Sequence, residues 1–200
     1  MARIARPATL PPLSPPSTAA RPGDDGRYHR IQDTADRFRI TDAEAGAFMT
    51  EIIRPRLSEV LGGVIDAEGP VERLDVISRV AKGFGFKKAG SRIRAFIEEC
   101  MPPRPETMED DVVFLWPASS VPGVIPFRAP ATDDDIRYAK DIAVEELTGL
   151  AGSLPGDITE DAAIERMARA IGIARITAGA RERLEQAWSL VCEATVRTGE

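Results

Sequence analysis

Apolar residues recur at helical spacing in three segments of the first half of the chain. Between Pro55 and Asp66 they follow i, i+3, i+4, i+7, i+8, which is typical of a helix that buries one stripe. A second helix is expected from about Arg73 to Gly85. A third is expected from Ser91, a favourable N-cap, to the break at Pro102. The pattern predicts that these helices bury Leu57, Val60, Leu61, Val64, Ile65, Leu74, Ile77, Ala81, Phe84, Ile93, Phe96, Ile97 and Cys100.

Shorter elements flank these helices. Thr41 and Glu44 have the spacing of a capping box and predict a short helix that ends or kinks at Pro55. Val71 allows at most a very short strand, whereas the β-branched and aromatic run from Val112 to Trp116 predicts a clear one. Three helices followed by strand material is the order of a winged helix-turn-helix.

The second half resembles the first. Thr132 and Asp135 repeat the capping pattern, and apolar spacing predicts a helix from Ile136 to Leu150. A shift of 87 positions keeps the apolar positions of the two halves in phase and pairs Gly85 with Gly172. Unrelated amphipathic hairpins can also be slid into register, so this alternative stays open. The predicted fold is mainly α, with tandem tri-helical, winged helix-turn-helix-like units, the first of which has a small β wing.

The sequence predicts five parts. Residues 1–26 form a Pro-rich arm that we expect to be disordered. Residues 27–53 form an N-terminal extension with a short helix, and residues 54–117 a winged-helix-like domain. Residues 118–131 form a Pro-rich linker, and residues 132–200 a second tri-helical domain.

Charge is unevenly distributed. The chain has a formal net charge of -6, from 26 basic and 32 acidic residues. Residues 79–94 nevertheless contain six basic residues and no carboxylate, so the remaining chain sits at -12. This concentration predicts a surface that binds a polyanion, and duplex DNA is the expected partner. The expected binding residues are Arg79, Lys82, Lys87, Lys88, Ser91, Arg92 and Arg94.

Two further considerations bear on whether these residues bind DNA. Cations at helix ends also complement the helix dipole, so the same residues could form an ordinary solvated face. In the second half, the arginines of the corresponding hairpin are interleaved with Glu165, Glu182 and Glu185, which predicts a mixed surface. We therefore expect the first unit to be the DNA binder, with little base reading because no Asn or Gln lies nearby.

No motif predicts enzymatic chemistry, a cofactor or a metal site. The segment from Gly85 to Ser91 lacks the lysine after the second glycine and the preceding strand of a phosphate loop. The acidic runs at 109–111 and 133–135 are better explained as a wing tip or loop and as the first turn of a helix. A single histidine and two cysteines, both expected to be buried, supply no zinc ligand set.

Targeting signals are also missing from the sequence pattern. There is no apolar run of eighteen residues, and the first residues lack the apolar stretch of a secretory signal. We expect a cytoplasmic protein.

Four short motifs carry a family resemblance over roughly residues 50–190. They are Glu68-Gly69-Pro70, Gly85-Phe86, Gly90-Ser91-Arg92-Ile93 and Leu115-Trp116-Pro117. With these motifs the chain resembles the uncharacterised domain at the C-terminal end of large bacterial superfamily 1 DNA helicases that also carry a Vsr-like endonuclease domain. This resemblance implies a DNA-handling context and a non-catalytic module, and it supplies no catalytic residues.

Two functional hypotheses follow. The first is a non-catalytic, sequence-nonspecific DNA-binding accessory module linked to a helicase or nuclease system. The second is a protein-interaction or scaffolding subunit that docks on a helicase or self-associates, as the acidic balance and the mixed second unit would suit. The oligomeric state is left open.

Overall fold

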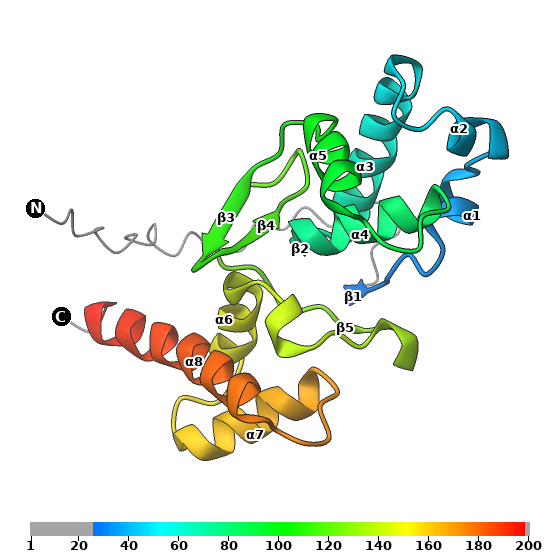
Figure 1. Ribbon diagram of the computed structural model, residues 1–200. Coiled ribbons are helices and arrows are strands. Elements are labelled where there is room, and N and C mark those ends of the chain that lie inside the picture. Colours follow the sequence, from blue (N-terminus) through cyan, green and yellow to red (C-terminus); the bar gives the residue numbers. More distant parts are fainter. Residues whose placement is uncertain (1–25, 199–200) are drawn as a thin grey trace, which may run out of the picture.

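The computed structural model describes residues 26–198, so the predicted disordered arm lies outside the described residues. Short helices and strands alternate along this part of the chain (Figure 1). In chain order the elements are β1 (Arg27–Tyr28), α1 (Thr34–Phe38), α2 (Asp42–Gly46), η1 (Glu51–Ile53), α3 (Arg54–Glu68), β2 (Val71–Glu72), α4 (Arg73–Gly83), α5 (Ser91–Glu99), β3 (Glu106–Glu109), β4 (Val112–Leu115), β5 (Ala129–Pro130), η2 (Asp133–Asp135), η3 (Ala139–Asp141), α6 (Val144–Gly152), α7 (Glu160–Ala170) and α8 (Ala178–Thr198).

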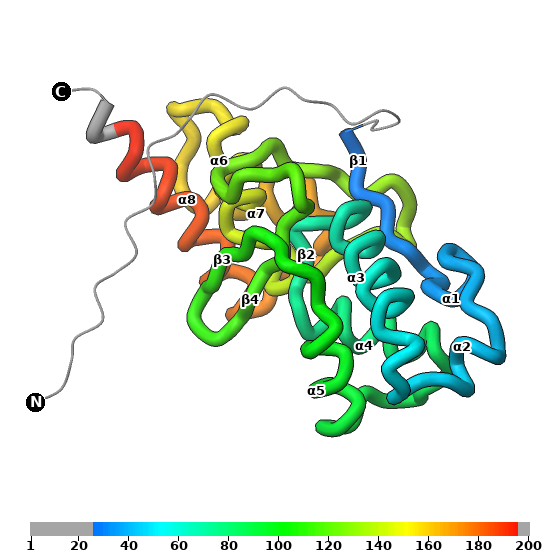
Figure 2. Tube along the Cα trace, turned by 90° about the horizontal axis from the view of Figure 1, so that it is seen from above, coloured from blue at the N-terminus to red at the C-terminus, as the bar shows by residue number. Residues whose placement is uncertain are grey.

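Two hydrophobic cores follow each other in sequence. The first lies between residues 48 and 115, and the second between residues 139 and 187. Figures 1 and 2 show α1 to α5 gathered on one side of the molecule and α6 to α8 on the other, with the three-stranded sheet between. The fold is mainly helical with a small sheet, as the sequence predicts.

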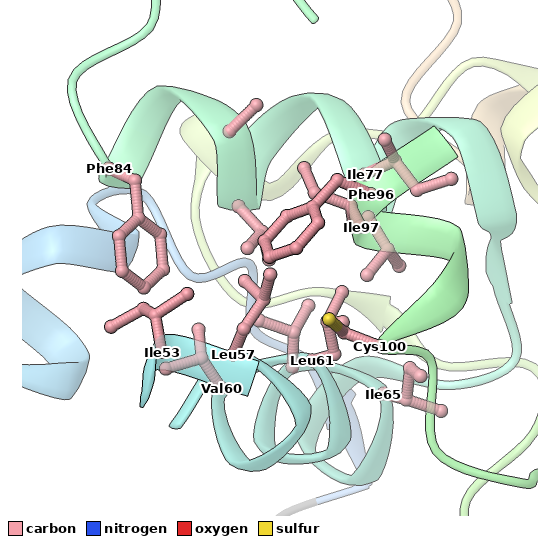
Figure 3. Close-up of a cluster of buried hydrophobic side chains, with 14 of the residues drawn as sticks. Ile53, Leu57, Val60, Leu61, Ile65, Ile77, Phe84, Phe96, Ile97 and Cys100 are labelled. Atoms are coloured by element: carbon pink, nitrogen blue, oxygen red, sulfur yellow. The ribbon is translucent and has the colours of Figure 1, made fainter. Parts of the chain in front are cut away.

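Helix α3 is the centre of the first core. Its predicted stripe is fully buried, and α4 and α5 pack above it (Figure 3). Leu74 departs from the prediction, because it is 47% exposed while α4 buries Val76, Ile77, Val80 and Ala81. Leu74, in the first turn of α4, therefore lies outside the buried face of this helix.

The sheet has the strand order β2-β4-β3, and both pairings are antiparallel. Strand β4 confirms the strand predicted from its β-branched and aromatic residues, and Phe114 and Trp116 are buried as expected. Strand β3 was missed because its sequence, Glu-Thr-Met-Glu, has no strand-forming apolar run, and only pairing with β4 shapes it. Residues 54–115 therefore run helix, strand, helix, helix, strand, strand.

The second half contains the three helices α6, α7 and α8, but the first of them does not begin at Ile136 as predicted. The predicted capping box of Thr132 and Asp135 is present, but it closes the short 3₁₀ turn η2. Ile136 then adopts an extended backbone, so the α-helix starts only at Val144. Cys192 also differs from the prediction, because it is exposed whereas Cys100 is buried.

The hairpins α4–α5 and α7–α8 have matching backbones. The helices α4 and α7 are both 11 residues long, and the turns place Gly85 at φ 89° and Gly172 at φ 84°. In each turn the amide of the residue after the glycine donates a hydrogen bond to the carbonyl oxygen five positions earlier. Phe86 N–H donates to Ala81 O at 3.1 Å, and Ile173 N–H donates to Ala168 O at 2.9 Å. Only a left-handed residue allows this turn, which is why glycine occupies both positions.

A polar network joins the two halves. Glu146 on α6 is completely buried and accepts hydrogen bonds from Arg128 at 2.9 Å and from Arg137 at 2.7 and 2.9 Å. Burial alone would raise the pKa of Glu146, but the two guanidinium charges lower it to about 2. Arg128 also donates to the backbone oxygen of Glu68 in the first half at 3.0 Å. The predicted linker is therefore a structured joint, and its strand β5 pairs with β1.

No helix within residues 26–198 combines the length and apolar character needed to cross a membrane.

Candidate nucleic-acid interface

The predicted cations lie on the hairpin α4–α5. Lys82 is in the last turn of α4, Lys87 and Lys88 are in the connecting turn, and Arg92 and Arg94 are in the first turn of α5. All five side chains are exposed. None of them forms an ion pair with any residue that the structure describes. Their charges are therefore available at the surface.

Local sequence explains why these charges are unpaired. No carboxylate occurs between residues 79 and 97, and the residue one turn before Lys82 is the uncharged Ser78. Most other arginines of this half lie beside an acid: Arg54 pairs with Glu51, and Arg56 pairs with Glu44 and Glu59. The exposed hairpin thus differs from its surroundings in its charge pattern.

Ser91 lies at the start of α5 and is exposed, but it is not the N-cap. Gly90 occupies that position, and no side chain caps the helix. The first amide groups of a helix have no intrahelical acceptor, and the helix dipole places partial positive charge there. The start of α5 therefore adds hydrogen-bond donors to a surface already flanked by Lys88 and Arg92.

Arg79 does not join the other predicted residues. Its side chain is 12% exposed and pairs with the fully buried Glu68 at 2.6 Å and with Asp75 at 2.9 Å. Burial disfavours its charge, but the hydrogen bond to Glu68 raises the pKa of Arg79 above its ordinary value. Glu68 also accepts from Tyr28 at 2.6 Å. The guanidinium group of Arg79 is neutralised inside the fold, so five of the six predicted cations remain exposed on the hairpin.

Two arginines that the sequence analysis missed are exposed on α1, the helix that packs against α4. Helix α1 packs on α4, and the side chain of Thr34 lies so close to Gly83 that a Cβ there would fall 3.0 Å from it. Arg37 and Arg39, at the end of α1, are exposed and form no ion pair within residues 26–198. They lie more than 40 positions before Lys82 in the sequence, so only the packing of α1 against α4 brings their helix next to the α4–α5 hairpin.

The acidic hairpin β3–β4 points elsewhere. Its turn contains Asp110 and Asp111, so this part of the acidic run lies in a loop. Glu109, beside the turn, accepts a 2.6 Å hydrogen bond from the Val144 amide at the start of α6 and pairs with Arg183 on α8. The hairpin therefore packs on the second half and contributes no positive charge to the interface.

The corresponding hairpin α7–α8 is mixed in charge, as predicted. Arg169 pairs with Glu165 at 3.4 Å, and Arg181 pairs with Asp161 at 3.1 Å and with Glu185 at 3.3 Å. By the spacing of 87, Arg169 corresponds to Lys82. In the second hairpin Arg169 and Arg181 thus have carboxylate partners, whereas their counterparts in the first hairpin, Lys82 and Arg94, have none among the described residues.

Two other kinds of binding chemistry, metal ligation and base stacking by Trp116, find no support in the described part of the chain. No group of three or more His, Cys, Asp or Glu residues among 26–198 could hold a metal ion. The indole N–H of Trp116 donates to Thr107 at 3.1 Å inside the fold, so this ring is not an exposed stacking surface.

Comparison with known proteins identifies one family. A family described as "Protein of unknown function (DUF3320)" matches residues 47–95. The matched region contains α3, α4, the turn and the start of α5, and therefore all five exposed cations of the interface. No curated protein and no solved structure matches the chain.

Proposed function

We propose that the protein is a non-catalytic, sequence-nonspecific DNA-binding accessory module that uses the α4–α5 hairpin. One observation carries this proposal: Lys82, Lys87, Lys88, Arg92 and Arg94 are all exposed on the same hairpin and have no carboxylate partner in the described structure. In an acidic protein, such a surface is the part that a polyanion can approach.

The topology of the first half supports a winged-helix interpretation. Its helix-strand-helix-helix-strand-strand order and its β2-β4-β3 sheet match that architecture, with α5 in the place of the recognition helix. We also propose that the second half is a copy of the first without a wing, which the matched turns at Gly85 and Gly172 support.

DNA contact through this hairpin would be mainly to phosphates. Lysine is a flexible point charge, and the uncapped start of α5 offers amide donors that suit phosphate oxygens. Such contacts position a protein on a duplex but carry no sequence information. The expected result is salt-sensitive binding to any duplex sequence.

Charge reversal tests the proposal. Fluorescence anisotropy with a labelled duplex should show the Lys87→Glu/Lys88→Glu variant binding at least about tenfold more weakly than the unmodified chain at low salt, because each lost phosphate contact removes counterion release. The matched control is Arg166→Glu/Arg169→Glu, which makes the same charge change on α7. Equal losses in the two variants, or no binding by the unmodified chain, would reject the α4–α5 interface.

We further propose that the module works with a helicase or nuclease system. This part rests on the family resemblance of the motifs between residues 68 and 117. It is tested by measuring whether the purified protein changes the DNA affinity of a superfamily 1 helicase from the same genome. Unchanged affinity at saturating protein would count against it.

The second candidate is a protein-interaction subunit. The observation that favours it is an open cavity on the second half, at the turn between α7 and α8.

A further inference from the structure

A cavity of about 540 Å³ opens at the turn of the hairpin α7–α8. One wall is the turn, with Gly172 and Ile173, together with the start of α8 at Gly179, and the other is the segment before α6, including Ile136 and Tyr138. Ile136 and Tyr138 are 37% and 71% exposed, which is high for large apolar or aromatic side chains. Its volume falls in the range of ligand-binding pockets, and its walls are mainly apolar.

The first half shows what fills the corresponding space there. The ring of Phe48 lies against the hairpin α4–α5, with ring centroids 5.3 Å from Phe84, 4.7 Å from Phe86 and 5.4 Å from Phe96. Phe48 comes from the segment before α3 and is buried. An aromatic side chain therefore covers the turn of the first hairpin.

The second hairpin lacks this covering ring. A shift of 87 positions pairs Phe84, Phe86 and Phe96 with Ile171, Ile173 and Arg183. Phe48 itself corresponds to Asp135, whose carboxylate is held by the Arg30 amide at 2.8 Å and by Thr132. Of the three counterparts only Ile173 lines the cavity, and the side chain of Ile136, rather than an aromatic ring, lies beside Gly172.

The mouth of the cavity is positively charged. Arg175 and Lys140 line it, and both are exposed. Arg175 forms no ion pair with the described residues, whereas Lys140 lies 4.0 Å from Asp141 and also interacts electrostatically with Glu72. Arg137 also lines the cavity, but its charge is used by Glu146. No carboxylate lines the cavity.

We propose that this cavity binds an acidic peptide segment of another protein and takes up one aromatic side chain of that segment. The ring would pack on Ile173, as Phe48 packs on Phe86 in the first half, while flanking carboxylates would face Arg175 and Lys140. The first 23 residues of this chain contain three arginines and no acid, so charge disfavours them as the occupant. This site is separate from the proposed DNA interface and does not depend on it.

The test uses the full chain and a fluorescein-labelled probe peptide that contains one Phe flanked by three acidic residues on each side. Two matched peptides replace the Phe by Ala or the acids by Lys. Binding is measured by anisotropy, and the contact is located by the NMR shifts of the Gly172 and Gly179 amides. We expect the Phe→Ala peptide to bind about tenfold more weakly, as one apolar side chain in a pocket commonly contributes, and the Lys peptide not to bind.

Two protein variants and a control locate the site. Gly179→Leu fills the cavity, and no atom lies within 4 Å of a Cβ at this position, so the fold should tolerate it. It should abolish binding, whereas Arg175→Glu should weaken binding about fivefold because it reverses a charge at the rim. Arg166→Glu makes the same charge change on α7 outside the cavity and should leave the affinity unchanged.

Each remaining outcome overturns the proposal. No shift of the Gly172 and Gly179 amides at millimolar peptide, or undiminished binding to Gly179→Leu, would show that the cavity is not a peptide site. If the substitutions Leu10→Ala and Leu13→Ala in the full chain shift the NMR signals of these amides, the cavity binds the chain's own N-terminal segment. Concentration-dependent shifts without peptide would assign it to a second copy, and shifts with oligothymidine but not with the peptide would assign it to single-stranded DNA.

Discussion

Lys82 and Arg169 occupy the same position in two hairpins whose turns have the same hydrogen bonds, yet only Arg169 has a carboxylate partner. The difference lies one turn earlier, where the second hairpin has Glu165 and the first has Ser78. Asp161, which pairs with Arg181, likewise corresponds to Leu74 in the first hairpin. One backbone thus carries two different charge patterns, and the side chains rather than the fold distinguish the two surfaces.

Pairing in the second hairpin has little effect on folding. Exposed ion pairs such as Arg169–Glu165 contribute only about 0–1 kcal/mol to the free energy of unfolding. Leaving the cations of the first hairpin unpaired therefore costs the fold almost nothing. Their charge is free to serve binding, which is the contrast that the following predictions test.

The largest effect is expected where charge is buried. Glu146→Gln leaves the guanidinium groups of Arg128 and Arg137 without their carboxylate at the joint, and it should lower the free energy of unfolding by about 4 kcal/mol. Urea denaturation measures this, with the exposed Glu165→Gln as control, for which we expect a change within about 0.5 kcal/mol. Similar values for both variants would show that buried and surface pairs do not differ in this molecule.

Acid should act on the same joint. The pKa of Glu146 is about 2 in the folded protein and 4.5 as its ordinary value, so its stabilising contribution is present above pH 4.5. The contribution is lost as the pH falls from 4.5 to 2, by about 3 kcal/mol in total. Thermal unfolding across this range should show a loss that is smaller in Glu146→Gln. An identical pH profile for the variant would contradict the assignment.

Removing the covering ring should make the first hairpin resemble the second. Phe48→Ala empties the space above Phe84, Phe86 and Phe96, and we expect the free energy of unfolding to fall by about 3 kcal/mol. Ile52→Ala, four residues away and 85% exposed, is the control and should change it by less than about 0.5 kcal/mol. A small effect of Phe48→Ala would mean that the ring is not needed to cover the turn.

The smallest effect on stability is expected from exchanging the charge pattern. Ser78→Glu gives Lys82 the partner that Arg169 has, and it should change the free energy of unfolding by less than about 1 kcal/mol. The affinity for duplex DNA should nevertheless fall about threefold, because one cation becomes paired. The control Ser78→Gln should bind as the unmodified chain does, and equal affinity for Glu and Gln would remove Lys82 from the interface.

The parts of the fold that the sequence predicts are those determined locally. The stripe of α3, the capping box at Thr41 and the strand β4 each depend on neighbouring residues, and all are confirmed. Strand β3 and the joint at Glu146 depend on partners distant in sequence, so local patterns did not show them. Within the candidate site, exposure of the cations around the turn follows from helical spacing. The prediction that Arg79 belongs to the exposed site is wrong, because its ion-pair partner Glu68 lies on another helix.

The salt dependence of duplex binding tests the central claim most directly. Five phosphate contacts by the α4–α5 cations predict a slope of about -4.5 for the logarithm of the binding constant against the logarithm of the salt concentration. Replacing Lys87, Lys88 and Arg92 by Ala should reduce this slope to about -2, whereas replacing Arg166, Arg169 and Arg175 by Ala should leave it unchanged. A slope near zero for the unmodified chain, or an equal reduction by both triple variants, would contradict the account.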